Sequence, residues 1–197
     1  MNIPALLVLD LQNEMVHRDG VIGSTGFADI VEERGLINKV RQVLDAFREA
    51  GAPVVFVRVG FRADYADAMS RAPRVRWLQE QGGAVLGSWG CEIHETLSPR
   101  PDEMIITKQA VNPFFNTGLL LWLLRKQVET LVLCGVHTHM VVDATARAAD
   151  DSGFVVRVME DCCASPDPEM HKYEMERILP LFGEVLSSEL VIDSLRP

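Results

Sequence analysis

The chain is short of basic residues and has no long apolar run. It carries 19 Lys and Arg against 28 Asp and Glu, a formal net charge of −9, which argues against a nucleic-acid partner because phosphate backbones are bound by clustered cations. No apolar stretch approaches the roughly 20 residues that a membrane-spanning helix needs, and residues 1–14 lack a basic segment followed by a long apolar one. We therefore expect a soluble, cytoplasmic protein with no membrane partner.

Cysteine is scarce, and its spacing excludes some classes of site. The four cysteines stand at positions 91, 134, 162 and 163, which fits neither a zinc knuckle nor a disulfide framework, so we expect reduced thiols. Cys134 lies in an apolar run and is expected to be a small buried side chain. Cys162 follows Asp161 at the expected end of a strand, from which a thiol could approach a pocket.

Histidine is also scarce, and no metal or cofactor site is expected. The five histidines, at positions 17, 94, 137, 139 and 171, form no HExxH or comparable pair. His137 and His139 could place two imidazoles on one side of an extended segment, but a zinc site is not expected there.

Nearly half of the 197 residues are hydrophobic, which is enough for one large core and a single domain over residues 1–197. No repeat or low-complexity tract interrupts the chain. Apolar runs rich in Val, Ile and Leu predict buried strands at residues 5–9, 54–59, 104–107, 130–134 and 155–159. Helical patterns cover residues 36–50, 117–126, 141–151 and 168–182, and a last strand is expected near 184–191. This alternation predicts an α/β fold with an open parallel sheet of about six strands and helices on both faces.

Polar side chains follow the predicted strands and should meet at one edge of the sheet. Asp10, Arg58, Lys108, residues 135–137 and Asp161 all stand at the carboxyl ends of strands, where open parallel sheets bind ligands. Burial of a carboxylate beside a lysine can set its proton affinity, so Asp10 and Lys108 are the best candidates for acid–base chemistry. A structural ion pair that closes the edge is the alternative.

Residues 60–101 form the least regular stretch and are expected to cover this edge. The stretch contains Trp77 and Trp89 together with Arg62, Arg71, Arg74 and Arg76. Arg62 could meet either a substrate carboxylate or a surface acid. An aromatic side chain such as Phe114, just after Lys108, could form a wall of the pocket or pack in the core.

Four ordered segments resemble the isochorismatase-like superfamily of cysteine hydrolases, over about residues 3–190. They are Asp10-Leu11-Gln12-Asn13, Lys108 after Met104-Ile105-Ile106-Thr107, Gly135-Val136-His137-Thr138, and Asp143-Ala144-Thr145-Ala146-Arg147-Ala148-Ala149. The resemblance implies a three-layer, Rossmann-like α/β/α sandwich. The family's pattern Gly-Val-x-Thr-x-x-Cys places its nucleophilic cysteine at Val141, and valine cannot attack a carbonyl.

The resemblance also implies roles for individual residues. In cysteine members the Asp, here Asp10, deprotonates the thiol, the Lys, here Lys108, assists, and backbone N–H groups near position 141 stabilise an oxyanion. A non-proline cis peptide is expected between Val136 and His137. Nicotinamidase-like members bind zinc through Asp-x-His after the second strand, and residues 60–67 contain no histidine. Gln12 is expected either to orient Asp10 or to cap the loop that follows, and the second, structural role is preferred.

True isochorismatases of the superfamily carry glycine at the nucleophile position and cleave a vinyl ether without a covalent intermediate. His139 coincides with a histidine in those enzymes, but Val141 is bulkier than glycine, which disfavours isochorismate itself. The leading hypothesis is a metal-free, cofactor-free hydrolase that acts on a small anionic molecule through Asp10 and Lys108. Its expected substrate contacts are Gln12, Arg62, Phe114, Val136, His137 and His139.

Two other hypotheses stay open. One is a pseudo-hydrolase that binds a metabolite or a partner without turnover. The other is an amidase that uses a displaced cysteine, which thiol alkylation would inactivate. As in the family, self-association into a homodimer or a larger homo-oligomer is expected.

Overall fold

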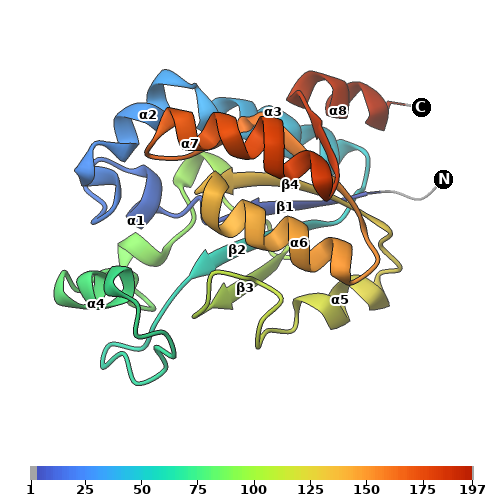
Figure 1. Cartoon of the computed structure of the whole chain (residues 1–197). Coiled ribbons are helices and arrows are strands. Elements are labelled where there is room, and N and C mark those ends of the chain that lie inside the picture. The colour runs from blue at the N-terminus through green and yellow to red at the C-terminus, as the bar shows by residue number, and fades with distance from the viewer. Residues whose placement is uncertain (1–3, 197) are drawn as a thin grey trace.

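A parallel sheet forms the centre of the computed structural model, which describes residues 4–196 (Figure 1). Within these residues the sheet has six strands in the order β3-β2-β1-β4-β5-β6, and every neighbouring pair is parallel. The strands are β1 Ala5–Leu9, β2 Val54–Val59, β3 Met104–Lys108, β4 Thr130–Val136, β5 Val155–Ala164 and β6 Glu184–Leu186. The predicted α/β/α sandwich with an open parallel sheet is confirmed.

Helices cover both faces of the sheet, and each face has its own apolar core. Successive β1 side chains point to opposite faces, so Leu6 and Val8 belong to one core while Leu7 and Leu9 belong to the other. Helices α2, α3 and α8 contribute to the first core, and α5 and α6 contribute to the second. The helices are α1 Asn13–Val16, α2 Phe27–Glu33, α3 Leu36–Glu49, α4 Pro73–Glu80, α5 Leu119–Arg125, α6 Asp143–Asp151, α7 Pro168–Tyr173 and α8 Ser188–Leu195.

Short helical turns connect several of these elements. Four are 3-10 turns, at Gly23–Thr25, Trp89–Cys91, Glu95–Leu97 and Leu179–Leu181. Two are π-helical, at Thr138–Val142 and Glu174–Ile178. No helix within residues 4–196 is long and apolar enough to cross a lipid bilayer.

The carboxy-terminal third corrects three sequence-based expectations. The last predicted strand, 184–191, is wrong beyond Leu186, because the Ser187 side chain accepts a hydrogen bond from the backbone of Leu190 and starts α8. The predicted helix 168–182 is divided into α7, the π-helical turn Glu174–Ile178 and the 3-10 turn Leu179–Leu181. The 3-10 turn contains Pro180, a residue without a backbone N–H donor. Strand β5 continues to Ala164, so Asp161 lies inside the strand rather than after it.

A glycine fixes how closely β4 approaches β1. Gly135 has φ of 132°, and a Cβ atom there would lie 2.0 Å from the carbonyl oxygen of Leu9. Asp10 follows Leu9 directly and has φ of 53°, an uncommon value for a residue with a side chain. This close approach of the two strands therefore sets the position of Asp10, after β1, relative to the residues that follow β4.

The irregular stretch 60–101 lies over the carboxyl ends of the strands and has a small core of its own. Phe61, Val75, Leu78 and Ala84 form this third apolar cluster, separate from the two on the sheet. Three consecutive side chains after β1 hold the stretch in place. Gln12 exchanges two hydrogen bonds with the backbone of Val59, the residue just before the stretch. Asn13 donates a hydrogen bond to the carbonyl oxygen of Trp89. Buried Glu14 accepts hydrogen bonds from the backbone N–H groups of Val21 and Ala84.

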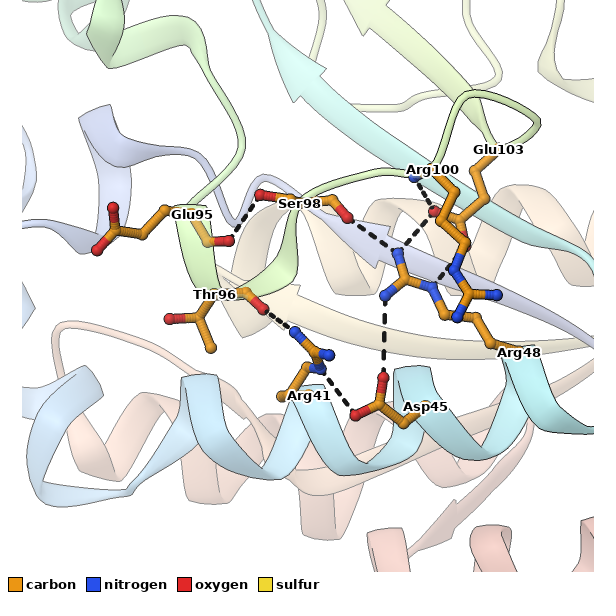
Figure 2. Close-up of polar contacts among 8 residues, drawn as sticks. All are labelled: Arg41, Asp45, Arg48, Glu95, Thr96, Ser98, Arg100 and Glu103. Atoms are coloured by element: carbon orange, nitrogen blue, oxygen red, sulfur yellow. Dashed lines mark hydrogen bonds and ion pairs between the residues drawn. The ribbon is translucent and has the colours of Figure 1, made fainter.

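An ion-pair network anchors the end of the same stretch to α3 (Figure 2). Arg48 and Glu103 form a two-pronged pair with both N–O distances at 2.7 Å, and their side chains are only 6% and 8% exposed. Arg48 also donates to the carbonyl oxygen of Ser98, and Arg41 donates to that of Thr96. The segment that leads into β3 is thereby fixed to the helix that precedes β2.

Candidate active site

A cavity of about 300 Å³ opens at the carboxyl ends of β1, β3 and β4. This is the edge at which open parallel sheets bind ligands. Most of its walls are apolar. Its lining consists of Asp10, Met15, Ile22, Thr25, Val59, Phe61, Arg74, Val75, Trp77, Leu78, Lys108, Gln109, Ala110, Val111, Val136, His137, Met140, Val141 and Pro166.

Asp10 and Lys108 form a buried ion pair at this cavity. Lys108 Nζ lies 2.8 Å from Asp10 Oδ2, and the two residues are 3% and 4% exposed. The second carboxylate oxygen, Oδ1, is buried and has no hydrogen-bond partner within residues 4–196. Burial raises the pKa of Asp10 above its usual range, and Lys108 offsets part of this effect. One oxygen is thus fixed while the other is free to exchange a proton with a bound molecule.

The turn after β4 places a neutral imidazole in the cavity wall. The peptide bond between Val136 and His137 is cis. His137 stacks against His139 with ring centroids 5.9 Å apart and meets the edge of Phe27 at 4.5 Å. Burial, with smaller contributions from His139 and Lys108, lowers the pKa of His137 to about 4. Its Nε2 atom is buried and lacks a partner within the described residues, so it can hydrogen-bond to a ligand.

Val141, the residue at which the sequence resemblance implies a cysteine, forms part of the cavity wall. It is 2% exposed and belongs to the π-helical turn Thr138–Val142 that leads into α6. None of the four cysteines, all of which the structure describes, is among the lining residues. Burial raises the pKa of each thiol, that of Cys162 to about 12. The expectation that Cys162 could approach a pocket is therefore wrong.

A second polar network lies beneath the same turn. The Thr138 hydroxyl is 2.8 Å from His171 Nδ1, His171 Nε2 is 3.0 Å from Glu160 Oε1, and Arg34 donates to that oxygen at 2.8 Å. Thr138 is fully buried and is not part of the cavity lining. A hydroxyl, an imidazole and a carboxylate in this order resemble an activated nucleophile, but here the hydroxyl is out of reach of the cavity. The network fixes the start of the turn that carries Val141.

Four predicted substrate contacts lie outside the cavity lining. The Gln12 side chain is hydrogen-bonded to the backbone of Val59, as described above. Arg62 pairs with Asp64 at an exposed site. Phe114 packs on Phe154 with ring centroids 6.3 Å apart, as part of the second core. The fourth, His139, shares a hydrogen bond of 2.8 Å with the hydroxyl of Ser165.

Two further residues of the predicted edge also have structural partners. Arg58 donates to the Thr107 hydroxyl and to the carbonyl oxygen of Cys91. Asp161 accepts two hydrogen bonds from Ser188 at the start of α8. The structure thus brings Asp10, Lys108, Val136, His137 and Val141 together in one cavity.

The sequence did not reveal which residues of the stretch 60–101 line the cavity. Arg74 and Trp77 on α4 do so, while the neighbouring Arg76 does not. Pro166 after β5 is another lining residue that gave no signal. Among residues 4–196, no group of three or more His, Cys, Asp or Glu side chains is arranged to hold a metal ion.

Comparisons with known proteins agree with this architecture. The family model described as the Isochorismatase domain matches residues 4–189. The uncharacterized isochorismatase family protein YecD of Escherichia coli O157:H7 is 33% identical over 198 residues, which are 97% of this chain and 95% of that protein. The ureidoacrylate amidohydrolase RutB of Acinetobacter baylyi is 26% identical over 203 residues, which are 96% of this chain and 82% of that protein.

Solved structures show the same fold. An isochorismatase family protein from Desulfovibrio vulgaris superposes with a TM-score of 0.86 at 24% identity, covering 99% of both chains. N-carbamoylsarcosine amidase from Thermoplasma acidophilum superposes with a TM-score of 0.75 at 26% identity, covering 95% of this chain and 97% of that one.

Proposed function

Because the chain belongs to the isochorismatase family, we propose that it is a hydrolase that acts on a small anionic molecule through Asp10 and Lys108, without a covalent thiol intermediate. The observation that carries the proposal is the asymmetry of the Asp10 carboxylate. Lys108 holds Oδ2 at 2.8 Å, whereas Oδ1 is buried at the cavity without a partner among the described residues. A carboxyl group held in this way is positioned for proton transfer to and from a ligand.

In the proposed reaction Asp10 carries the proton. Its raised pKa favours a protonated carboxyl group more than an exposed aspartate would. Asp10 gives this proton to the substrate, a water molecule attacks the carbon activated by protonation, and the proton that the water loses returns to Asp10. The bond between that carbon and the leaving group then breaks as Asp10 donates its proton to the leaving group and takes up the proton of the hydroxyl group on that carbon. One water is consumed and the enzyme is unchanged.

Lys108 and His137 have supporting roles in this scheme. The ammonium group of Lys108 stabilises the Asp10 carboxylate after each proton transfer. His137 is neutral near pH 7, since its pKa is lowered to about 4, and its unpaired Nε2 atom can orient the substrate or the water. Val141 supplies only an apolar surface to the cavity.

The reacting bond can be sought among amides and related groups as well as vinyl ethers. Two of the similar proteins, a ureidoacrylate amidohydrolase and an N-carbamoylsarcosine amidase, are named as enzymes that act on carbon–nitrogen bonds. A test panel should therefore contain ureido and carbamoyl acids, small amides and esters, and isochorismate. The panel is to be measured with wild type, Asp10→Asn and Lys108→Met.

We expect Asp10→Asn to lower kcat by roughly 10²- to 10⁴-fold, the usual contribution of a general acid or base, and Lys108→Met to lower it as well. Alkylation of the buried thiols with iodoacetamide should leave turnover intact. Asp161→Asn is the matched control, because Asp161 is on strand β5 of the same sheet but accepts hydrogen bonds from Ser188 and does not line the cavity. Its kcat should stay within a factor of two of wild type.

The alternative of a pseudo-hydrolase is favoured by one observation, the apolar Val141 in the wall where the family pattern has a nucleophile. This alternative would be supported if the folded wild-type protein binds some members of the panel but hydrolyses none of them. Loss of turnover on alkylation would instead point to a thiol enzyme.

We also propose that the protein self-associates, on the strength of its family resemblance. Light scattering on the eluting peak of a size-exclusion column tests this directly. A mass near the 21.9 kDa of one chain at micromolar concentration would contradict it.

A further inference from the structure

The acidic and basic side chains of the cavity differ in whether they already form an ion pair. Three of its lining residues, Asp10, Lys108 and Arg74, have acidic or basic side chains. The Lys108 ammonium group is already paired with Asp10 at 2.8 Å and is almost completely buried. The Arg74 side chain is exposed and has no hydrogen-bond or ion-pair partner among residues 4–196. Arg74 is therefore the cation of the cavity that can accept an anionic ligand.

The arrangement of these charges orients an anionic ligand. An anionic group beside Asp10 would approach the unpaired Oδ1 atom. Once Asp10 has given up its proton, the two negative charges would repel each other strongly in the apolar cavity. Asp10 is 4% exposed whereas Arg74 faces solvent, so the two lie at the inner and outer ends of the cavity. The charged end of a ligand is thus favoured at Arg74, and its uncharged end at Asp10.

Helix α4 presents an aromatic surface together with this cation. Trp77 follows Arg74 by three residues, which places both side chains on the same side of the helix. Both line the cavity, and the Trp77 side chain is 39% exposed. Phe61, Val75 and Leu78 continue the apolar wall inward. A ligand that fits these walls has an apolar body between its two polar ends.

We propose that Arg74 binds the carboxylate of the substrate, and that the substrate class is small carboxylic acids with an apolar, aryl-sized body whose neutral reacting bond points to Asp10. The planar guanidinium group matches a carboxylate with two parallel hydrogen bonds. The position of the reacting bond rests on the proposed function, while the carboxylate subsite rests on the cavity alone.

Calorimetric titration with two probes of the same shape tests the subsite without turnover. Phenylacetate carries the carboxylate, and phenylacetamide replaces it with a neutral amide. We expect wild type to bind phenylacetate at least 10-fold more tightly than phenylacetamide. Arg74→Gln should reduce this preference to less than 2-fold, and Arg74→Lys, which keeps the charge without the planar fork, should retain part of it.

Arg76→Gln is the control variant, because Arg76 is exposed on the same helix but does not line the cavity. Its preference for phenylacetate should equal that of wild type. The inference is overturned if wild type shows no preference for phenylacetate, including no measurable binding of it, or if the preference persists in Arg74→Gln.

The two proposals can fail independently. Arg74-dependent binding together with an absence of hydrolysis across the substrate panel would reject the proposed function and keep the carboxylate subsite. Turnover that depends on Asp10, with a probe preference unaffected by Arg74→Gln, would reject the subsite and keep the proposed function.

Discussion

At the scale of single residues, His137 links the cavity to the stability of the fold. Its ring is packed between Phe27 and His139, and its pKa falls from an ordinary 6.5 to about 4 because burial disfavours the charged imidazolium. The folded protein thus resists protonation of a side chain that the unfolded chain protonates readily. Such a group leaves the stability unchanged while it is neutral in both states, and it destabilises the fold at a pH where only the unfolded state is protonated.

We therefore predict that His137 makes unfolding easier in mild acid. Between pH 6.5 and pH 4 the unfolded state takes up a proton that the folded state does not, so the free energy of unfolding falls as the pH falls. From pH 7 to pH 4.5 this contribution is about 2 kcal/mol, and His137→Gln should lose that much less stability than wild type. Urea unfolding at the two pH values measures the difference.

Met140→Leu serves as the control for this measurement, because Met140 lines the same cavity but has no titratable group. Its loss of stability between the two pH values should match that of wild type. Equal losses in wild type and His137→Gln would show that the imidazole is protonated in the folded state as well.

The sequence revealed the central site residues better than the contacts around them. Asp10 and Lys108 directly follow or end strands that are visible as apolar runs, so their meeting at the sheet edge was predictable. The partners of Gln12 and Arg62 depend on the path of residues 60–101, which has no periodicity to read. For the same reason the sequence could not distinguish Arg74, which lines the cavity, from Arg76, which does not.

At the scale of secondary-structure elements, a buried ion pair is one of the links between α3 and the segment before β3. Arg48 and Glu103 are almost fully buried, and the Glu103 carboxylate also accepts a hydrogen bond from the backbone of Arg100 (Figure 2). Removing one partner leaves the other charge buried and uncompensated, which is costly even though an intact buried pair contributes little net stability.

We predict that Arg48→Met lowers the free energy of unfolding by about 3–5 kcal/mol. The double variant Arg48→Met, Glu103→Gln should recover part of this loss, because no unpaired charge stays buried. Arg41→Met on the same helix is the control. Arg41 is 45% exposed and pairs with Asp45, so its removal should cost less than about 1 kcal/mol.

Urea unfolding of the three variants separates the two kinds of ion pair. If Arg48→Met costs no more than Arg41→Met, the pair behaves as an ordinary surface interaction. The affinity for phenylacetate should be unchanged in all three, because none of the residues lines the cavity.

Elements that are buried on both faces were the most predictable. Strands β1 and β2 were predicted with their observed bounds, since continuous runs of Val and Leu leave little choice for a strand covered by helices on both sides. The carboxy-terminal elements were less predictable, because strand Glu184–Leu186 has only three residues and the apolar residues of α8, from Leu190 on, follow it closely. What separates them is the hydrogen bond from Leu190 to Ser187, which the composition of the segment does not reveal.

At the scale of the whole molecule, the two sheet cores are joined through the strands. Adjacent residues of β1 belong to opposite cores, and β1 lies between β2 and β4 in the middle of the sheet. Neither core can be exposed while the other stays intact, because loss of β1 would remove side chains from both.

We predict that the chain unfolds in one cooperative transition, as expected for a single domain. Differential scanning calorimetry should give a calorimetric enthalpy equal to the van't Hoff enthalpy. Arg48→Met should move this transition to a lower temperature without splitting it. Two resolved transitions, or an enthalpy ratio well above one, would show that the chain contains two independently folding units.

The third cluster, of Phe61, Val75, Leu78 and Ala84, lies outside these two cores and contributes three residues to the cavity wall. Substitutions in it can reshape the space next to Asp10 and Lys108 without altering the strands that hold that pair. For protein engineering, the cluster is a small region in which a library of variants could change which molecules enter the cavity at little risk to folding. Over evolutionary time, the same separation would let new substrate preferences arise from few mutations.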